Sequence, residues 1–93
     1  MEADLWYVLA GTRGAETRAA ILEAIADQPQ NAHQLAKRLG YDYTTIRHHL
    51  AVLDEHDVVD SAGSGYGNVY LPSSAVREEW AVVEEIIATI RED

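Results

Sequence analysis

The sequence predicts a mainly α-helical protein with one small β-hairpin. Apolar residues recur at spacings of three and four in several stretches, and capping residues, glycines and prolines mark the ends of these stretches. Two short apolar segments around a glycine-rich stretch predict the hairpin. At 93 residues, the chain has room for a single domain, 1–93, which buries roughly 60 to 65% of the surface of its unfolded form. Its core is therefore small, and a second copy of the chain would add burial.

The N-terminal segment, 1–10, holds a short apolar run from Leu5 to Leu9. This run is too short to stand alone as a helix or a strand. We therefore expect the segment to dock on another surface, with Leu5 and Trp6 in a dimer interface.

The next segment, 15–27, is predicted to be a helix that Pro29 ends. Arg18 lies near Glu16 and Glu23 in the sequence, and we expect it only to balance their charge. The buried face of this helix is predicted to hold three apolar residues, Ile21, Leu22 and Ile25.

Two further helices are predicted on either side of Gly40. Asn31 can cap the first of them, and Gln34 can reach back to the backbone of the cap. Gly40 supplies the left-handed conformation that ends this helix, and Asp42 can cap the next. Two helices joined by about three residues that include a glycine are typical of a helix-turn-helix.

The second of these helices, from Tyr43 onward, is predicted to have a buried and an exposed face. At 100° per residue, positions four and three apart share one face of a helix. The buried face is expected to hold Ile46, Leu50 and Leu53, and the exposed face Thr44, Arg47, His48 and Ala51.

The hairpin is predicted from strands at 58–61 and 69–71, with three glycines in the connection between them. A hairpin after a helix-turn-helix is a wing, so the core over 12–71 is predicted to be a winged helix-turn-helix. After Pro72 a C-terminal helix is expected over 74–91, capped by Ser73 or Ser74. Its apolar seam, which suits a dimerisation helix, comprises Val76, Trp80, Val83, Ile87 and Ile90.

The stretches NAHQLAKRLG at 31–40 and YTTIRHHLAVL at 43–53 resemble the ArsR-like winged helix-turn-helix transcriptional regulators, and in particular small haloarchaeal members. The resemblance covers roughly residues 12 to 71. It implies a homodimer whose two recognition helices lie about 34 Å apart, one turn of DNA. It also implies that His49 is buried and that Arg47 and His48 face DNA. The metal sensors of this family need cysteine, or carboxylate and histidine ligands at the dimer helix. The chain has no cysteine and no histidine in its last helix, so we expect no metal.

Several polar residues are candidates for contacts with double-stranded DNA. Arg47 can donate two hydrogen bonds to a guanine edge, and side chains at a helix start commonly meet phosphates. A solvated or capping role is the alternative for each. The predicted DNA-binding residues are Thr44, Thr45, Arg47 and His48 of the recognition helix, Lys37 and Arg38 of the preceding helix, and Tyr66 and Asn68 of the wing.

The net charge of −9 is unusual for a protein that binds a polyanion. Residues 1–50 are nearly neutral, and the acidic excess lies in residues 51–93. The prediction of DNA binding therefore requires that no carboxylates crowd the surface around Arg47. The acidic, lysine-poor composition is similar to that of halophilic archaeal proteins, whose cytoplasm holds concentrated salt that screens charge to about 3 Å at 1 M.

Other classes of protein find little support in the sequence. We find no nucleophile elbow, phosphate-binding loop or metal-ligand spacing, so we expect no enzyme and no cofactor. No apolar run is long enough to span a membrane, and no secretion signal is present, so we expect a cytoplasmic protein. The leading hypothesis is a sequence-specific, repressor-like DNA-binding regulator. The alternative is a winged helix that docks other proteins in a transcription complex without binding DNA.

Overall fold

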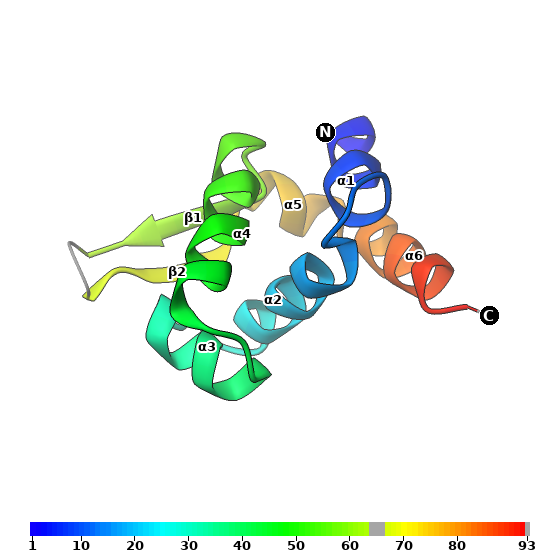
Figure 1. Cartoon of the computed structure of the whole chain (residues 1–93). Coiled ribbons are helices and arrows are strands. Elements are labelled where there is room, and N and C mark those ends of the chain that lie inside the picture. Colours follow the sequence, from blue (N-terminus) through cyan, green and yellow to red (C-terminus); the bar gives the residue numbers. More distant parts are fainter. Residues whose placement is uncertain (64–66, 93) are drawn as a thin grey trace.

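The winged helix-turn-helix predicted from the sequence is the fold of this protein. The computed structural model describes residues 1–63 and 67–92. Over these residues the chain forms, in order, α1 Glu2–Ala10, α2 Ala15–Asp27, α3 Ala32–Leu39, α4 Tyr43–Glu55, β1 Val59–Ala62, β2 Val69–Pro72, α5 Ser74–Glu78 and α6 Trp80–Ile90 (Figure 1).

Helices α3 and α4 form the helix-turn-helix, and their predicted caps are confirmed. The Asn31 side chain accepts a hydrogen bond from the backbone of Gln34, and the Gln34 side chain accepts one from the backbone of Asn31, each at 2.8 Å. Gly40 ends α3 with a φ of 78°. The carboxylate of Asp42 accepts from the backbone of Thr45 at 2.7 Å, which starts α4. These local bonds fix the angle at which α4 leaves the turn.

The wing is an antiparallel hairpin in which Val59 pairs with Pro72 and Ala62 with Val69. Its strands lie within one residue of their predicted positions. A bridge between Gln30 and Tyr70 attaches β2 to the chain before α3, where the backbone amide of Tyr70 donates to the carbonyl of Gln30 at 2.8 Å. The hairpin projects away from the helices on the left of Figure 1, on the opposite side of the molecule from α1 and α6.

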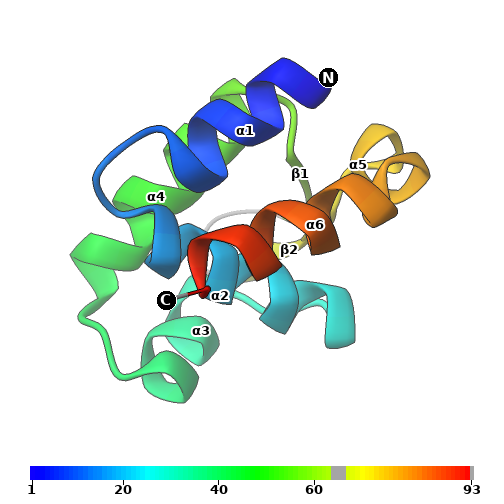
Figure 2. The ribbon, with the colours of Figure 1, turned by 90° about the vertical axis from the view of Figure 1, so that its right-hand side faces the viewer.

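The N-terminal segment differs from expectation, because residues 2–10 form the helix α1. Leu5, Val8 and Leu9 are fully buried within the chain itself, and α1 packs against α2 and α6 (Figure 2). Packing on two neighbours stabilises a helix that would not persist alone. The segment therefore docks on another surface of its own chain, as a helix that the sequence analysis did not predict.

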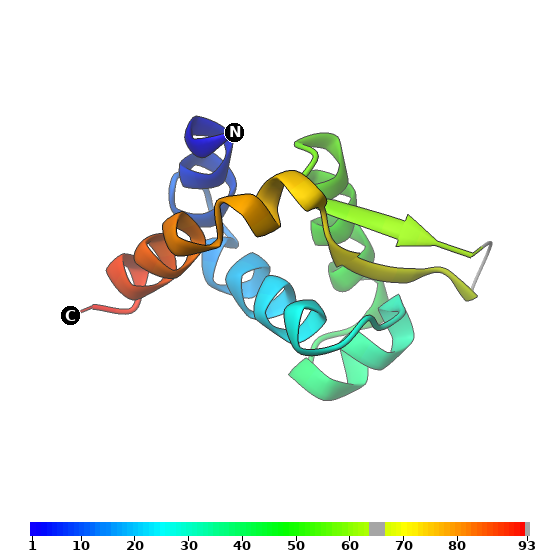
Figure 3. The ribbon, with the colours of Figure 1, turned by 180° about the vertical axis from the view of Figure 1, so that it is seen from behind.

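The C-terminal helix predicted over 74–91 is interrupted at Glu79. The Glu79 amide donates to the carbonyl of Val76, three residues back, and its own carbonyl accepts from Val82 and Val83. This tighter turn ends α5, and α6 continues in a different direction (Figure 3). The predicted cap is confirmed at Ser73, whose side chain accepts from the backbone of Val76.

Arg91 fastens the end of α6 to α2 through ion pairs with Glu16 and Glu23, at 2.7 and 2.9 Å. Hydrogen bonds that Arg91 donates to the two carboxylates raise its pKa. Both acidic residues therefore pair with Arg91. The prediction that Arg18 balances their charge was wrong. Within the described part of the chain, no helix is both long and apolar enough to cross a membrane.

Candidate nucleic-acid interface

Helix α4 has the two faces that its sequence predicts. Ile46, Leu50 and Leu53 are buried in the core. Thr44, Arg47, His48 and Ala51 are exposed. At the start of the helix, hydrogen bonds from Thr45 hold the pKa of Asp42 below its ordinary value, so the carboxylate stays ionised as a cap. The exposed face is thus presented from a helix that is anchored on its other side.

Arg47 sits beside an aromatic pair on this face. Its guanidinium donates to the hydroxyl of Tyr43 at 3.2 Å, and its central carbon lies 5.9 Å from the centroid of that ring. Tyr43 stacks in turn on His33 of α3, with 4.1 Å between the ring centroids. The stack spans the helix-turn-helix and gives Arg47 a fixed rest position.

A shallow hollow of about 240 Å³ separates α4 from the wing. Arg47 lines it together with Asn68 and Tyr70 of the hairpin. The side-chain oxygen of Asn68 is buried, and among the described residues it accepts no hydrogen bond. Asp54 also lines the hollow, so the surface around Arg47 is not spared from carboxylates as the sequence interpretation required.

Two of the other predicted DNA contacts lie outside this hollow. Lys37 and Arg38 are exposed on the last turn of α3, and Arg38 forms an ion pair with Asp27 at 3.4 Å. Neither lines the hollow between α4 and the wing. Tyr66 lies outside the residues that the structure describes. The structure therefore brings Arg47 and Asn68 together and leaves Lys37 and Arg38 as separate positive charges.

The buried side of α4 holds a contact that the sequence analysis missed. Arg18 of α2 is only 3% exposed. Its guanidinium donates to the carbonyl of Val8 at 2.7 Å and to the carbonyl of Arg13 at 3.2 Å, and also to the hydroxyl of Thr12. A further nitrogen lies 3.1 Å from Nδ1 of His49. Arg18 therefore joins α1 and the loop before α2 to the recognition helix.

His49 is neutral in this contact. Because a guanidinium can only donate, Nδ1 of His49 accepts and the ring proton lies on Nε2. Burial, together with the charges of Arg18 and His48, lowers the pKa of His49. The prediction that His49 is buried is confirmed. A helical signal pointed to Arg18 as well, since it precedes Ile21 by three residues and thus shares the core face.

The residues predicted at a dimer interface divide into two groups. The first group is buried within one chain and contacts its own core; it comprises Leu5, Val76, Val83 and Ile87. Trp6 and Ile90 are half-buried, as is Trp80, and they keep exposed surface beside the core. Whether these residues meet a partner stays a prediction. Over residues 1–63 and 67–92, no three His, Asp or Glu side chains gather as a metal site.

A helix-turn-helix followed by a short hairpin defines a winged helix-turn-helix protein. Here the guanidinium of Arg47 lines the hollow between α4 and the hairpin. The family model described as "Bacterial regulatory protein, arsR family" matches residues 15–61, which is just over half of the chain. The chain belongs to this family.

Solved structures share the fold over nearly the whole chain. A homodimeric winged helix-turn-helix DNA-binding domain of Mb0332 from Mycobacterium bovis, a possible ArsR-family transcriptional regulator, has 20% identity and a TM-score of 0.73, covering 98% of this chain and 81% of that one. An ArsR-like transcriptional regulator from Rhodococcus sp. RHA1 has 27% identity and a TM-score of 0.68, covering 95% and 78%.

A more distant structure, overoxidized AbfR bound to DNA, has 13% identity and a TM-score of 0.66, covering 98% of this chain and 70% of that one. AbfR is a protein of Staphylococcus epidermidis. Among curated proteins, none matches the chain.

Proposed function

We propose that this chain is a sequence-specific DNA-binding regulator that places α4 in the major groove and its wing over the flanking backbone. The observation that carries the proposal is the exposed guanidinium of Arg47, held beside Tyr43 on the outward face of α4. Such a group matches the two acceptors of a guanine edge. Because Tyr43 and His33 restrict its position, less freedom is lost on binding.

The surrounding polar residues are proposed to contact the sugar-phosphate backbone. Thr44 and Thr45 lie at the N-terminus of α4, where the helix dipole favours phosphate, and His48 is exposed next to Arg47. From the preceding helix, Lys37 and Arg38 are proposed to meet a neighbouring phosphate. In the wing the candidates are Asn68 and Tyr66.

Asp54 places a negative charge in the hollow. A carboxylate repels a phosphate that comes close to it. We propose that Asp54 rejects wrongly placed DNA, while Arg47 holds the correct base pair.

We further propose that the chain binds as a homodimer, with half-sites about 34 Å apart, and that it represses by covering a promoter. The M. bovis neighbour is described as homodimeric and AbfR as bound to DNA, which supports both parts. The small core of one chain also favours a partner. The exposed parts of Trp6 and Ile90 are the proposed contacts.

A concentrated-salt cytoplasm, as in halophilic archaea, is the proposed setting. Near 1 M salt the Debye length is about 3 Å, so a net charge of −9 would repel DNA only at contact. The free energy of unfolding should accordingly increase from dilute buffer to molar potassium chloride, as urea titrations at each salt would measure.

Protein docking without DNA is the second candidate, which the acidic charge and Asp54 favour. Selection from random duplexes in molar potassium chloride separates the two. A DNA regulator enriches an inverted repeat, and its log affinity falls with log salt by about 0.9 per phosphate contact. Recovery of only weak, sequence-independent binding would support docking instead.

Dimerisation is tested by Ile90→Glu, with Thr89→Glu as the matched control on the same turn of α6. Ile90 is half-buried against the core and Thr89 is exposed, so only the first change puts a charge into the proposed interface. Sedimentation should give monomers for Ile90→Glu and dimers for Thr89→Glu, with circular dichroism as a check of folding. A wild-type monomer at micromolar concentration would remove the dimer from the proposal.

A further inference from the structure

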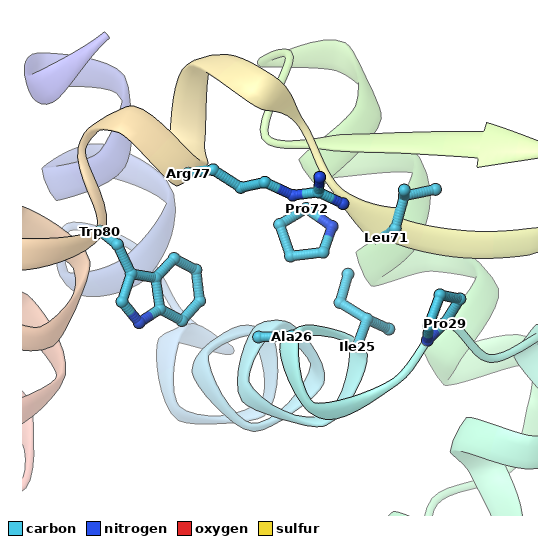
Figure 4. A pocket seen from close by; sticks show the side chains of 7 residues that line it. All are labelled: Ile25, Ala26, Pro29, Leu71, Pro72, Arg77 and Trp80. Carbon is cyan, nitrogen blue, oxygen red and sulfur yellow. The ribbon is translucent and has the colours of Figure 1, made fainter.

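A pocket of about 390 Å³ lies on the side of the molecule away from the recognition face of α4. Figure 4 shows it between α2, the strand β2 and the start of α6, with α5 above it. Its apolar walls are Ile25, Pro29, Leu71, Pro72 and Trp80. The volume falls within the range of small-molecule sites, roughly 300 to 1,000 Å³.

One charged residue, Arg77, lines this pocket. Its side chain extends from α5 along the rim toward the strand (Figure 4). Among residues 1–63 and 67–92, no carboxylate pairs with Arg77.

We propose that this pocket binds a small organic acid, with an apolar chain or ring inside and one carboxylate on Arg77. A guanidinium is suited to a carboxylate because it can donate two parallel hydrogen bonds. The apolar walls place the remainder of the ligand against the ring of Trp80, which faces the cavity in Figure 4. A neutral molecule would leave Arg77 unused, and an amine would be repelled.

The pocket also touches the element that carries the wing. Leu71 and Pro72 belong to β2, and both pair with β1 in the hairpin. A ligand that contacts β2 and α2 at once would bias the angle between the hairpin and the helices. This regulatory consequence rests on the proposed DNA binding, whereas binding of the acid does not.

Fluorescence of Trp80 tests the proposal in the absence of DNA. The chain has two tryptophans, so Trp6→Phe leaves Trp80 as the sole reporter. This protein would be titrated with octanoate, 1-octanol and octylamine, which share a chain and differ in head group. We expect a saturable change with octanoate, at an affinity about tenfold or more above those of the other two.

Two substitutions of Arg77 test its role. Arg77→Gln should weaken octanoate about tenfold and leave 1-octanol unaffected, and Arg77→Glu should reverse the preference between octanoate and octylamine. Arg13→Gln, in the exposed loop before α2, is the matched control and should change nothing. Equal affinity for octanoate and 1-octanol, or no saturable change at all, would overturn the proposal.

Filling the pocket gives an independent check. Ala26 is exposed on α2 and lines the pocket, so Ala26→Phe should keep the fold and abolish octanoate binding. Sedimentation of the same variant identifies the alternative occupant, a second copy of the chain. A dimer that dissociates when the pocket is filled, without octanoate binding in the wild type, would assign the pocket to an interface and contradict the proposal.

Discussion

Two arginines lie on opposite faces of α4 and have opposite environments. Arg18 of α2 contacts the buried face, and Arg47 belongs to the outer face. On the buried face, Arg18 is 3% exposed and bonds to three elements of the same chain. On the outer face, Arg47 is exposed beside one tyrosine. A guanidinium whose donors are directed to buried acceptors holds a structure together, and one on an exposed face can also reach a ligand. Residue type alone does not separate the two roles.

The difference also predicts what each substitution costs. Removing Arg18 leaves the carbonyl of Val8 and Nδ1 of His49 buried without a donor, and each such group costs about 1 to 3 kcal/mol. Arg47 lies on the exposed face of α4, so we expect its removal to cost less stability. Stability should therefore depend on the first arginine and recognition of DNA on the second.

The largest effect is expected for Arg18→Met, which keeps the apolar stem and removes the guanidinium. The free energy of unfolding should fall by about 3 kcal/mol, measured by urea titration. Arg13→Met, in the exposed loop nearby, is the control and should stay within about 0.5 kcal/mol. A loss of less than about 1 kcal/mol for Arg18→Met would mean that the buried contact contributes little.

Gly14→Ala should have the next largest effect. Gly14 has a φ of 87°, and a Cβ there would lie 2.6 Å from Cε1 of His49, so backbone strain and a clash add to about 2 kcal/mol of lost stability. Gly40→Ala is the matched control, since its φ is 78° but its Cβ would meet nothing within 4 Å. Equal losses of stability in the two variants would show that a Cβ at position 14 does not clash with the ring of His49.

Asp54→Asn tests the outer face. Removing this carboxylate should strengthen binding to all duplexes, by about 1 kcal/mol at low salt, and reduce discrimination between sequences. Fluorescence anisotropy on the selected and a scrambled duplex measures both effects. Glu55→Asn, the next residue on α4, does not line the hollow and serves as control. Weaker binding by Asp54→Asn would show a direct, favourable base contact.

The smallest effect is a pH dependence on the buried face. Burial lowers the pKa of His49 from its ordinary value of 6.5, so the unfolded chain takes up a proton more readily than the folded one. The contribution of His49 to stability is complete above pH 6.5 and is lost as the pH falls below it. His49→Gln should flatten this part of the unfolding profile relative to the wild type, whereas His33→Gln should keep it.

Much of the fold could be predicted because its signals are local. The caps at Asn31 and Asp42 act within three residues, and the spacing of Ile46, Leu50 and Leu53 decides which face of α4 is buried. The α1 helix and the break at Glu79 could not be predicted in this way. The first depends on contacts between segments far apart in the chain, such as α1 with α6, and no glycine or proline marks the second.

The candidate site was predicted less completely than the fold. Arg47 is exposed as predicted, since helical periodicity determines its direction. Asp54 was overlooked beside it, although a spacing of seven residues on α4 is about two helical turns and places both on one face, where both line the hollow. Arg18 was assigned to Glu16 and Glu23 by closeness in sequence, although its helical position indicated the core.

The most direct test compares Arg47→Ala with the wild type on the duplex recovered by selection. The account predicts a loss of about 1 to 3 kcal/mol in binding and relaxed preference at one base pair, with the free energy of unfolding unchanged. Arg47→Lys should recover the charge but not the preference. Unchanged affinity and unchanged sequence preference in Arg47→Ala would contradict the claim that this face of α4 reads DNA.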